Sequence, residues 1–179
     1  MKEIRFDNIK TIEDAKNYLN QIDIENDNIE KIDIIVKLTN AGVSQEIINR
    51  LDDLWDKTMF LGKESVAVGR IITIKIMEFV EQNPDVAAGV AIGAAVALLA
   101  AQIPLIGSLL APIAFALGLV GVYREGKRER GEEIEPGLKG IINDLIAIAK
   151  KFFKLIIETF KVIKERYSNN LQLQPVRIV

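Results

Sequence analysis

The chain has 179 residues, a length typical of one domain, and it contains neither cysteine nor histidine. These absences exclude disulfide bonds, zinc fingers, thiolate nucleophiles and imidazole bases. The 23 basic and 25 acidic residues give a net charge of -2, which offers no general reason to expect nucleic acid as a partner. We therefore expect a protein that is not an enzyme and that has no cofactor, no metal ion and no nucleic-acid partner.

The charge is distributed unevenly along the chain. Residues 1–85 carry 11 basic and 17 acidic side chains, a balance of -6, whereas residues 86–179 carry 12 basic and 8 acidic side chains, a balance of +4. An acidic half and a basic half favour contact within a chain or between chains. The first residues are charged and precede no apolar core, so they do not predict a secretory signal peptide, and we expect the N-terminus to stay in the compartment of synthesis.

Residues 1–62 are predicted to form an acidic helical bundle. Thr11 and Ser44 are candidate N-caps of the first and third helices. This acidic bundle is a possible binding site for a protein partner. Apolar residues recur at helical spacing in three segments: Ile12, Ala15, Leu19 and Ile22; then Ile29, Ile32, Ile35, Val36 and Leu38; then Ile47, Ile48, Leu51, Leu54 and Trp55.

Three motifs in this bundle have a functional and a structural interpretation. Residues 38–51 have the layout of a helix-turn-helix, but acidic side chains dominate the second helix, which favours packing over DNA binding. The run Asp52-Asp53-Leu54-Trp55-Asp56 resembles the aspartate-rich magnesium site of isoprenoid synthases, although a solvated acidic helix face is the favoured interpretation. A calcium loop beginning at Asp23 is excluded because Asn28 replaces the turn glycine and Ile34 replaces the bidentate acid.

Residues 63–82 are predicted to form a connecting amphipathic helix. A run of β-branched residues there also fits a strand, but no partner strand is obvious nearby. The run consists of Val66, Val68, Ile71, Ile72, Ile74 and Ile76. The polar residues interrupt the run at spacings that a helix tolerates, so the helix is the favoured interpretation: Arg70, Thr73, Lys75, Glu78 and Glu81.

Residues 86–123 form the central feature, a run of 38 residues without a charged side chain. A single helix of this length would extend about 57 Å, nearly twice the roughly 30 Å core of a bilayer. Proline and glycine near its middle instead predict a hydrophobic helical hairpin over 83–123, with arms at about 84–102 and 105–123 and with Pro104 and Gly107 at its tip. We expect the sequence Asn83-Pro84-Asp85 to begin the first arm.

Small residues recur every four positions in both arms, a spacing that lets helices approach closely in lipid. We predict that these residues are packing sites at subunit contacts of a homo-oligomer: Gly89, Gly93, Ala97, Ala114 and Gly118.

Basic residues follow the hairpin. A charged junction spans 124–136, a basic amphipathic helix is predicted over 137–168, and 169–179 form a tail. The helix is expected to lie on an anionic membrane surface or to pack along the N-terminal bundle. The candidate membrane-surface residues are Arg124, Lys127, Arg128, Arg130, Lys150, Lys151, Lys154 and Lys161.

The sequence as a whole predicts an all-α helical bundle with a central Gly/Ala-rich hydrophobic hairpin and a long C-terminal amphipathic helix. The layout of residues 64–167 resembles the pore-forming domain of colicins, in which amphipathic helices enclose a hydrophobic hairpin. We expect an oligomeric protein that inserts into a lipid membrane and permeabilises it, with both termini cytoplasmic. The alternatives are a membrane-anchored adaptor and a scaffold, cytoplasmic and soluble, that buries the hairpin.

Overall fold

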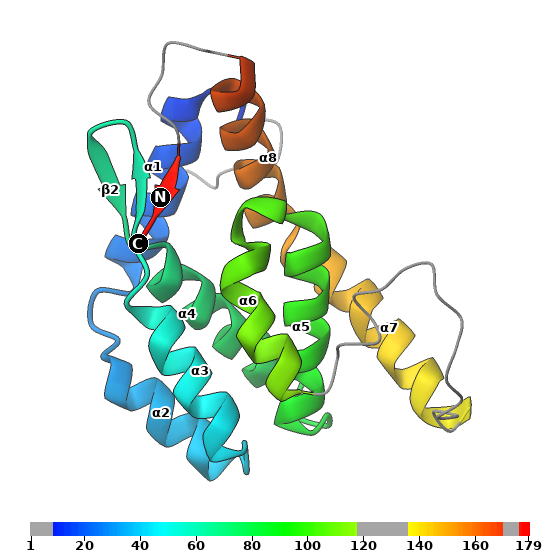
Figure 1. The fold of residues 1–179 in the computed structure, drawn as a ribbon. Coiled ribbons are helices and arrows are strands. Elements are labelled where there is room, and N and C mark those ends of the chain that lie inside the picture. The colour runs from blue at the N-terminus through cyan, green and yellow to red at the C-terminus, as the bar shows by residue number, and fades with distance from the viewer. Residues whose placement is uncertain (1–8, 118–135, 170–175) are drawn as a thin grey trace.

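The computed structural model describes residues 9–117, 136–169 and 176–179 (Figure 1). The described residues form eight helices and three short strands, so the expectation of a mainly helical protein is confirmed. The sequence did not predict the small sheet. The elements are α1 (Ile12–Glu25), α2 (Lys31–Asn40), α3 (Gln45–Trp55), β1 (Met59–Leu61), β2 (Glu64–Val66), α4 (Val68–Glu81), α5 (Ala88–Gln102), α6 (Pro104–Ala116), α7 (Pro136–Phe152), α8 (Lys154–Asn169) and β3 (Arg177–Ile178).

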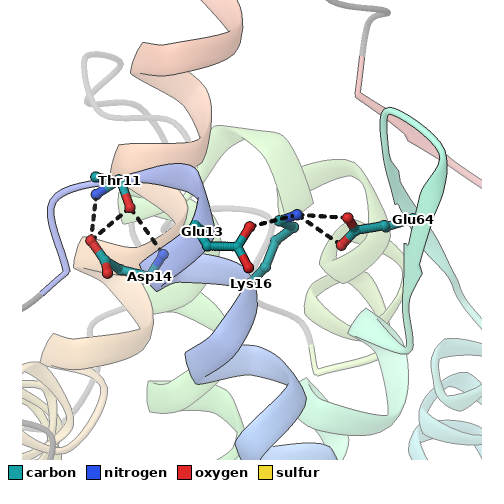
Figure 2. Close-up of polar contacts among 5 residues, drawn as sticks. All are labelled: Thr11, Glu13, Asp14, Lys16 and Glu64. Carbon is teal, nitrogen blue, oxygen red and sulfur yellow. Dashed lines mark hydrogen bonds and ion pairs between the residues drawn. The ribbon is translucent and has the colours of Figure 1, made fainter.

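Helix α1 begins with a capping box. The Asp14 backbone N–H donates to Thr11 Oγ1 at 3.1 Å, and the Thr11 backbone N–H donates to Asp14 Oδ2 at 2.8 Å, so the predicted cap at Thr11 is confirmed (Figure 2). One turn later, Lys16 Nζ lies 2.9 Å from Glu13 and 2.8 Å from Glu64 of β2. The Lys16 bridge therefore joins the first helix to the sheet.

Helices α2 and α3 are joined by a tight turn at Gly42. This glycine has a φ of 75°, a backbone conformation that residues with a Cβ rarely adopt. Ser44 occupies the predicted N-cap position of α3, although its side chain makes no capping hydrogen bond. The two helices pack against each other, and α3 also packs against α4.

The three strands form an antiparallel sheet in the order β2-β1-β3. Gly62, with a φ of 68°, occupies the first position of the two-residue turn between β1 and β2, as in a type II′ hairpin. The last residues of the chain pair with β1, where Thr58 and Val179 exchange hydrogen bonds of 2.8 and 3.0 Å. The C-terminus is thus held beside a strand more than a hundred residues earlier in the sequence.

Helix α4 occupies the centre of the fold and packs against α1, α3 and α5. The segment predicted as a connecting amphipathic helix over 63–82 is helical from Val68, and ten residues of α4 are buried. The structure differs from the prediction in two respects. The first residues of the segment belong to the β-hairpin, and the β-branched run is buried on most sides because helices cover it from three directions. Gly69 allows a close approach, since a Cβ there would lie 1.7 Å from the Leu54 carbonyl oxygen.

Arg70 is one of the few charged residues of α4, and it joins three helices. Its Nη2 donates to the Asn26 carbonyl oxygen at 2.6 Å, its Nη1 lies 3.4 Å from Asp23, and its guanidinium carbon lies 5.8 Å from the centre of the Trp55 ring. Asp27, which with Asp23 began like a calcium loop in the sequence, also lies 3.8 Å from Nη1, so both acids pair with the guanidinium group. This contact holds the C-terminal end of α1 against α4.

The C-terminal helix is interrupted at Phe153, so the single helix predicted over 137–168 is observed as α7 and α8. The Phe153 backbone N–H donates to the Ala149 carbonyl oxygen at 2.8 Å, and the Ile157 N–H donates to the Phe153 carbonyl oxygen at 2.9 Å. Helical hydrogen bonds therefore continue on both sides of the break. The Phe153 ring is fully buried, 5.4 Å from the Phe79 ring of α4. The break lets α7 pack against α5 while α8 packs against α1. Of the helix predicted over 137–168, the α8 part packs on the N-terminal bundle, as one of the two expected arrangements has it, whereas the α7 part packs on α5.

Candidate functional site

Helix α5 belongs to the uncharged run of the chain and lies between other helices. It packs against α4, α6 and α7, as Figure 1 shows near the centre of the molecule. It carries no charged side chain, and ten of its fifteen residues are buried. An uncharged helix needs no access to water for its side chains, and its neighbours remove most of its surface from solvent. The apolar arm is thus enclosed in this fold.

The start of α5 differs from the prediction. Asn83, expected as its cap, instead ends α4: its side-chain amide donates to the Phe79 carbonyl oxygen at 2.7 Å and its backbone N–H donates to that of Val80 at 3.1 Å. The next residues form turns, and α5 begins at Ala88. The asparagine is used at the end of the preceding helix because the carbonyl groups there lack partners.

The connection between α5 and α6 consists of a single residue, Ile103, which is buried. Pro104 occupies the first helical position of α6, where its missing N–H removes no hydrogen bond. Gly107, predicted at the tip, lies within the first turns of α6 instead. A Cβ at Gly107 would lie 3.5 Å from the Ala100 carbonyl oxygen, an ordinary contact, so this glycine marks where α6 passes close to α5.

Helix α6 presents an uncharged face to solvent. It packs on α5 and α3 with its other face, which buries Ile106, Leu110, Ile113 and Ala114. The Phe115 side chain is 69% exposed, an unusual environment for an aromatic ring. The exposed positions recur at helical spacing: Pro104, Ser108, Ala111, Pro112 and Phe115. We refer to these five residues as the outer face of α6.

The predicted packing glycines and alanines occupy different environments. Gly93 and Ala114 are buried within the fold, whereas Gly89 and Ala97 are partly exposed. A Cβ at Gly89 would meet no atom of the described residues within 4 Å, so no described helix approaches closely there. Gly118 lies outside the described residues.

The lengths of the described helices bear on membrane insertion. At a rise of about 1.5 Å per residue, the 15 residues of α5 extend about 23 Å and the 13 of α6 about 20 Å, against a bilayer core of about 30 Å. Throughout the described part of the chain, no helix combines the length and the apolar character that crossing a membrane requires. The predicted second arm, 105–123, continues past Leu117 into residues outside the description.

The predicted basic residues divide into two groups. Arg124, Lys127, Arg128 and Arg130 lie outside the described residues. Lys150, Lys151, Lys154 and Lys161 are exposed on α7 and α8, and Lys161 pairs with Glu158 at 3.0 Å. The apolar face of the same helices is occupied by contacts with α5 and α1. In this fold, therefore, much of the apolar face of α7 and α8 is covered, and these four lysines are accessible to a membrane surface.

A groove of about 540 Å³ lies between α3 and α6, and the sequence did not reveal it. Leu54, Leu109 and Pro112 form its apolar part, together with Ser108. Its charged part comes from α3 and the residues after it: Arg50, Asp53, Asp56 and Lys57. Because the two walls come from helices separated by some fifty residues of sequence, no local pattern could have indicated the groove.

The aspartate-rich run contacts a lysine. Lys31 Nζ of α2 lies 2.7 Å from Asp56 and 3.1 Å from Asp52, and the hydrogen bond to Asp56 raises the pKa of Lys31 above its ordinary value. Within the described residues, no three acidic side chains are grouped so that they would hold a metal ion. The run therefore joins α2 to the end of α3.

Comparison with known proteins identifies no relative: no family, no curated protein and no solved structure matches the chain. The likeness to the pore-forming domain of colicins thus remains one of layout.

Proposed function

We propose that the protein acts on lipid membranes by releasing α5 and α6 from the folded bundle and inserting them as a hydrophobic hairpin. The observation that carries this proposal is the outer face of α6, which is uncharged, exposed and includes an aromatic ring at Phe115. Such a face binds the apolar boundary of a bilayer without burying a charge. Helix α5, equally uncharged, would follow α6 because the two are joined by one residue.

Insertion requires the protein to assemble, since two helices per molecule cannot enclose an aqueous path. We propose a homo-oligomer in the membrane, with the small residues of the two arms at the subunit contacts. Both termini would stay on the cytoplasmic side because a hairpin returns the chain to the side from which it entered. Gly89 is the informative position, since a Cβ there meets no described atom within 4 Å, and Gly89→Leu should weaken membrane assembly more than it disturbs the folded bundle.

Dye release from vesicles containing anionic lipid tests the proposal. The wild-type protein should release the dye, and Phe115→Glu should reduce release strongly, because an acidic side chain in a membrane helix costs about 2.5 to 3.5 kcal/mol. Ile24→Glu is the matched control, since Ile24 of α1 is 74% exposed and lies outside the apolar pair. Vesicles that stay sealed with the wild-type protein, or equal loss in both variants, would contradict a membrane function of α6.

The burial of α5 favours a second candidate, a scaffold in which the apolar pair is a permanent core. The ten buried residues of α5 are typical of a central helix in a stable bundle, and covering them stabilises the fold. In this case α6 stays in place when vesicles are added.

A fluorescent label distinguishes the two candidates. Because the chain has no cysteine, Ser108→Cys places a single environment-sensitive dye on the outer face of α6, and Asn49→Cys places one on the exposed side of α3. Membrane insertion should move the Ser108 dye into an apolar environment and leave the Asn49 dye in water. A permanent core leaves both dyes unchanged.

A further inference from the structure

The groove between α3 and α6 combines an apolar centre with charged residues of both signs. Leu54 and Leu109 face it from the two helices, and Arg50 and Asp53 lie on the α3 side. Arg50 and Asp53 are exposed and also line an adjoining surface hollow of about 430 Å³. The acids next to Asp53, Asp52 and Asp56, pair with Lys31. Asp53 is therefore the acid of the groove that is available to a partner. The groove thus suits an apolar side chain flanked by one acid and one base.

Helix α7 carries a surface of that kind on the side that does not pack on α5. Ile148 is 49% exposed, with Asp144 four residues before it and Lys151 three residues after it, and both charged residues are exposed. At 100° per residue these three positions lie within about 60° of one another on the helix. We call Asp144, Ile148 and Lys151 the α7 stripe.

We propose that two copies of the chain associate head to tail, with the α7 stripe of one copy in the α3–α6 groove of the next. Leu54 is only 2% exposed, so Ile148 fills the apolar centre mainly against Leu109 and Pro112 of α6, and Lys151 lies beside Asp53. The groove and the stripe are different surfaces of one molecule, so after two copies pair, one keeps its α7 stripe free and the other keeps its groove free. Such a contact produces rings or open chains rather than a closed dimer.

This assembly does not depend on the proposed membrane function, because it uses the folded bundle and is measured without lipid. Sedimentation of the full chain over a range of concentrations should show oligomers that grow with concentration. Ile148→Glu should weaken association about tenfold or more, as expected for a central apolar contact. Ile24→Glu, on an exposed part of α1, should leave the association unchanged. A wild-type monomer at every concentration, or equal assembly of Ile148→Glu and wild type, would overturn the proposal.

A charge exchange tests which surfaces meet. Asp53→Lys and Lys151→Asp should each weaken assembly, because each places like charges in contact across the interface. The double variant should recover most of the association, since the attraction is restored with its direction reversed. Absence of recovery would refute the pairing of Asp53 with Lys151 and the head-to-tail geometry. Circular dichroism and Trp55 fluorescence confirm that each variant keeps the fold, which is expected because all the substituted residues are exposed or partly exposed.

Discussion

Two residues of α4 illustrate how contacts with residues distant in the sequence decide which amino acid a position can hold. Gly69 lies against the backbone of α3, where even a methyl group has no room, and its N–H donates to the Lys57 carbonyl oxygen at 2.9 Å. Arg70, the next residue, connects the end of α1 to Trp55. Neither role can be read from the sequence of α4, since in both cases the reason lies on another helix.

We predict opposite effects of adding a methyl group at two helical glycines. Gly69→Ala should lower the free energy of unfolding by about 3 kcal/mol, because a Cβ must displace the Leu54 backbone. Gly89→Ala should raise it by about 0.5 to 1 kcal/mol, because alanine favours the helix and the added methyl group meets no atom within 4 Å. Urea unfolding followed by Trp55 fluorescence measures both. Similar changes in the two variants would show that α3 and α4 are not in close contact at Gly69.

Tyr18 of α1 should make stability depend on pH in the alkaline range. Burial, followed by the nearby Glu78 and Glu25 carboxylates, raises the pKa of Tyr18 to about 12 from its ordinary 10.0. Above pH 10.0 the unfolded chain releases this proton while the folded chain retains it, so the stability falls as pH rises toward 12. Urea midpoints across this window should fall less steeply for Tyr18→Phe, which differs from the wild type in this one ionisable group. Equal slopes for the two proteins would contradict the raised pKa.

Whole helices show which sequence patterns are reliable in this protein. Helix α1 begins where its capping box places it, because the Thr11 and Asp14 contacts are local. The C-terminal helix has an amphipathic pattern that continues through Phe153, yet the element is split there, because α7 packs on α5 and α8 packs on α1. Periodicity predicts that a segment is helical, and the surfaces beneath the segment decide where it breaks.

We predict that Phe153 holds the junction of α7 and α8 to α4. Its ring is fully buried beside Phe79 and Phe152, so Phe153→Ala should cost about 3 to 5 kcal/mol. Phe152→Ala should cost less, because the Phe152 side chain is partly exposed. Hydrogen exchange should also accelerate in α5 when α7 is loosened, whereas α2 should exchange at an unchanged rate. Equal costs for the two variants, or no change in α5, would contradict this role of Phe153.

The whole molecule is organised by contacts between its beginning, its centre and its end. The C-terminal strand pairs with β1, α8 packs on α1, and the uncharged helix α5 lies between α4 and α7. The acidic first half and the basic second half therefore meet within one chain, as α1 and α8 demonstrate. The arrangement also places the two uncharged helices in different environments: α5 is enclosed, whereas α6 keeps its outer face in contact with solvent.

A designed disulfide should test the contact between the two ends of the chain. Met59 of β1 and Ile178 of β3 are directly opposite each other. Because the next pair, Thr58 and Val179, exchanges hydrogen bonds, Met59 and Ile178 form a non-hydrogen-bonded pair with Cα atoms about 4.5 Å apart. Met59→Cys with Ile178→Cys should oxidise spontaneously and raise the free energy of unfolding by roughly 4 to 5 kcal/mol over the reduced form. The gel mobility of the denatured chain reports the bond.

The matched control for this disulfide is Phe60→Cys with Ile178→Cys. Residues 60 and 178 are adjacent in register but point to opposite faces of the sheet, so this pair should stay reduced. Oxidation of the control pair alone would indicate a register different from the one described.

The sequence by itself determined the features that depend on local interactions. These include the mainly helical composition, the cap at Thr11, the first three helices of the chain and the uncharged run that begins at Val86. Each follows from side-chain spacing or from hydrogen bonds within one turn, which neighbouring residues settle without the rest of the chain. The predictions of membrane insertion and of assembly through small residues rest on this run and stay predictions.

Only the tertiary structure decided the features that depend on surfaces from distant segments. It used residues 59–66 as a β-hairpin and assigned Asn83 to the end of α4 instead of the start of α5. It buried α4 on most sides and formed a groove between α3 and α6. The physical reason is that burial, close backbone contact and strand pairing are properties of two surfaces together, and a sequence pattern describes only one of them at a time.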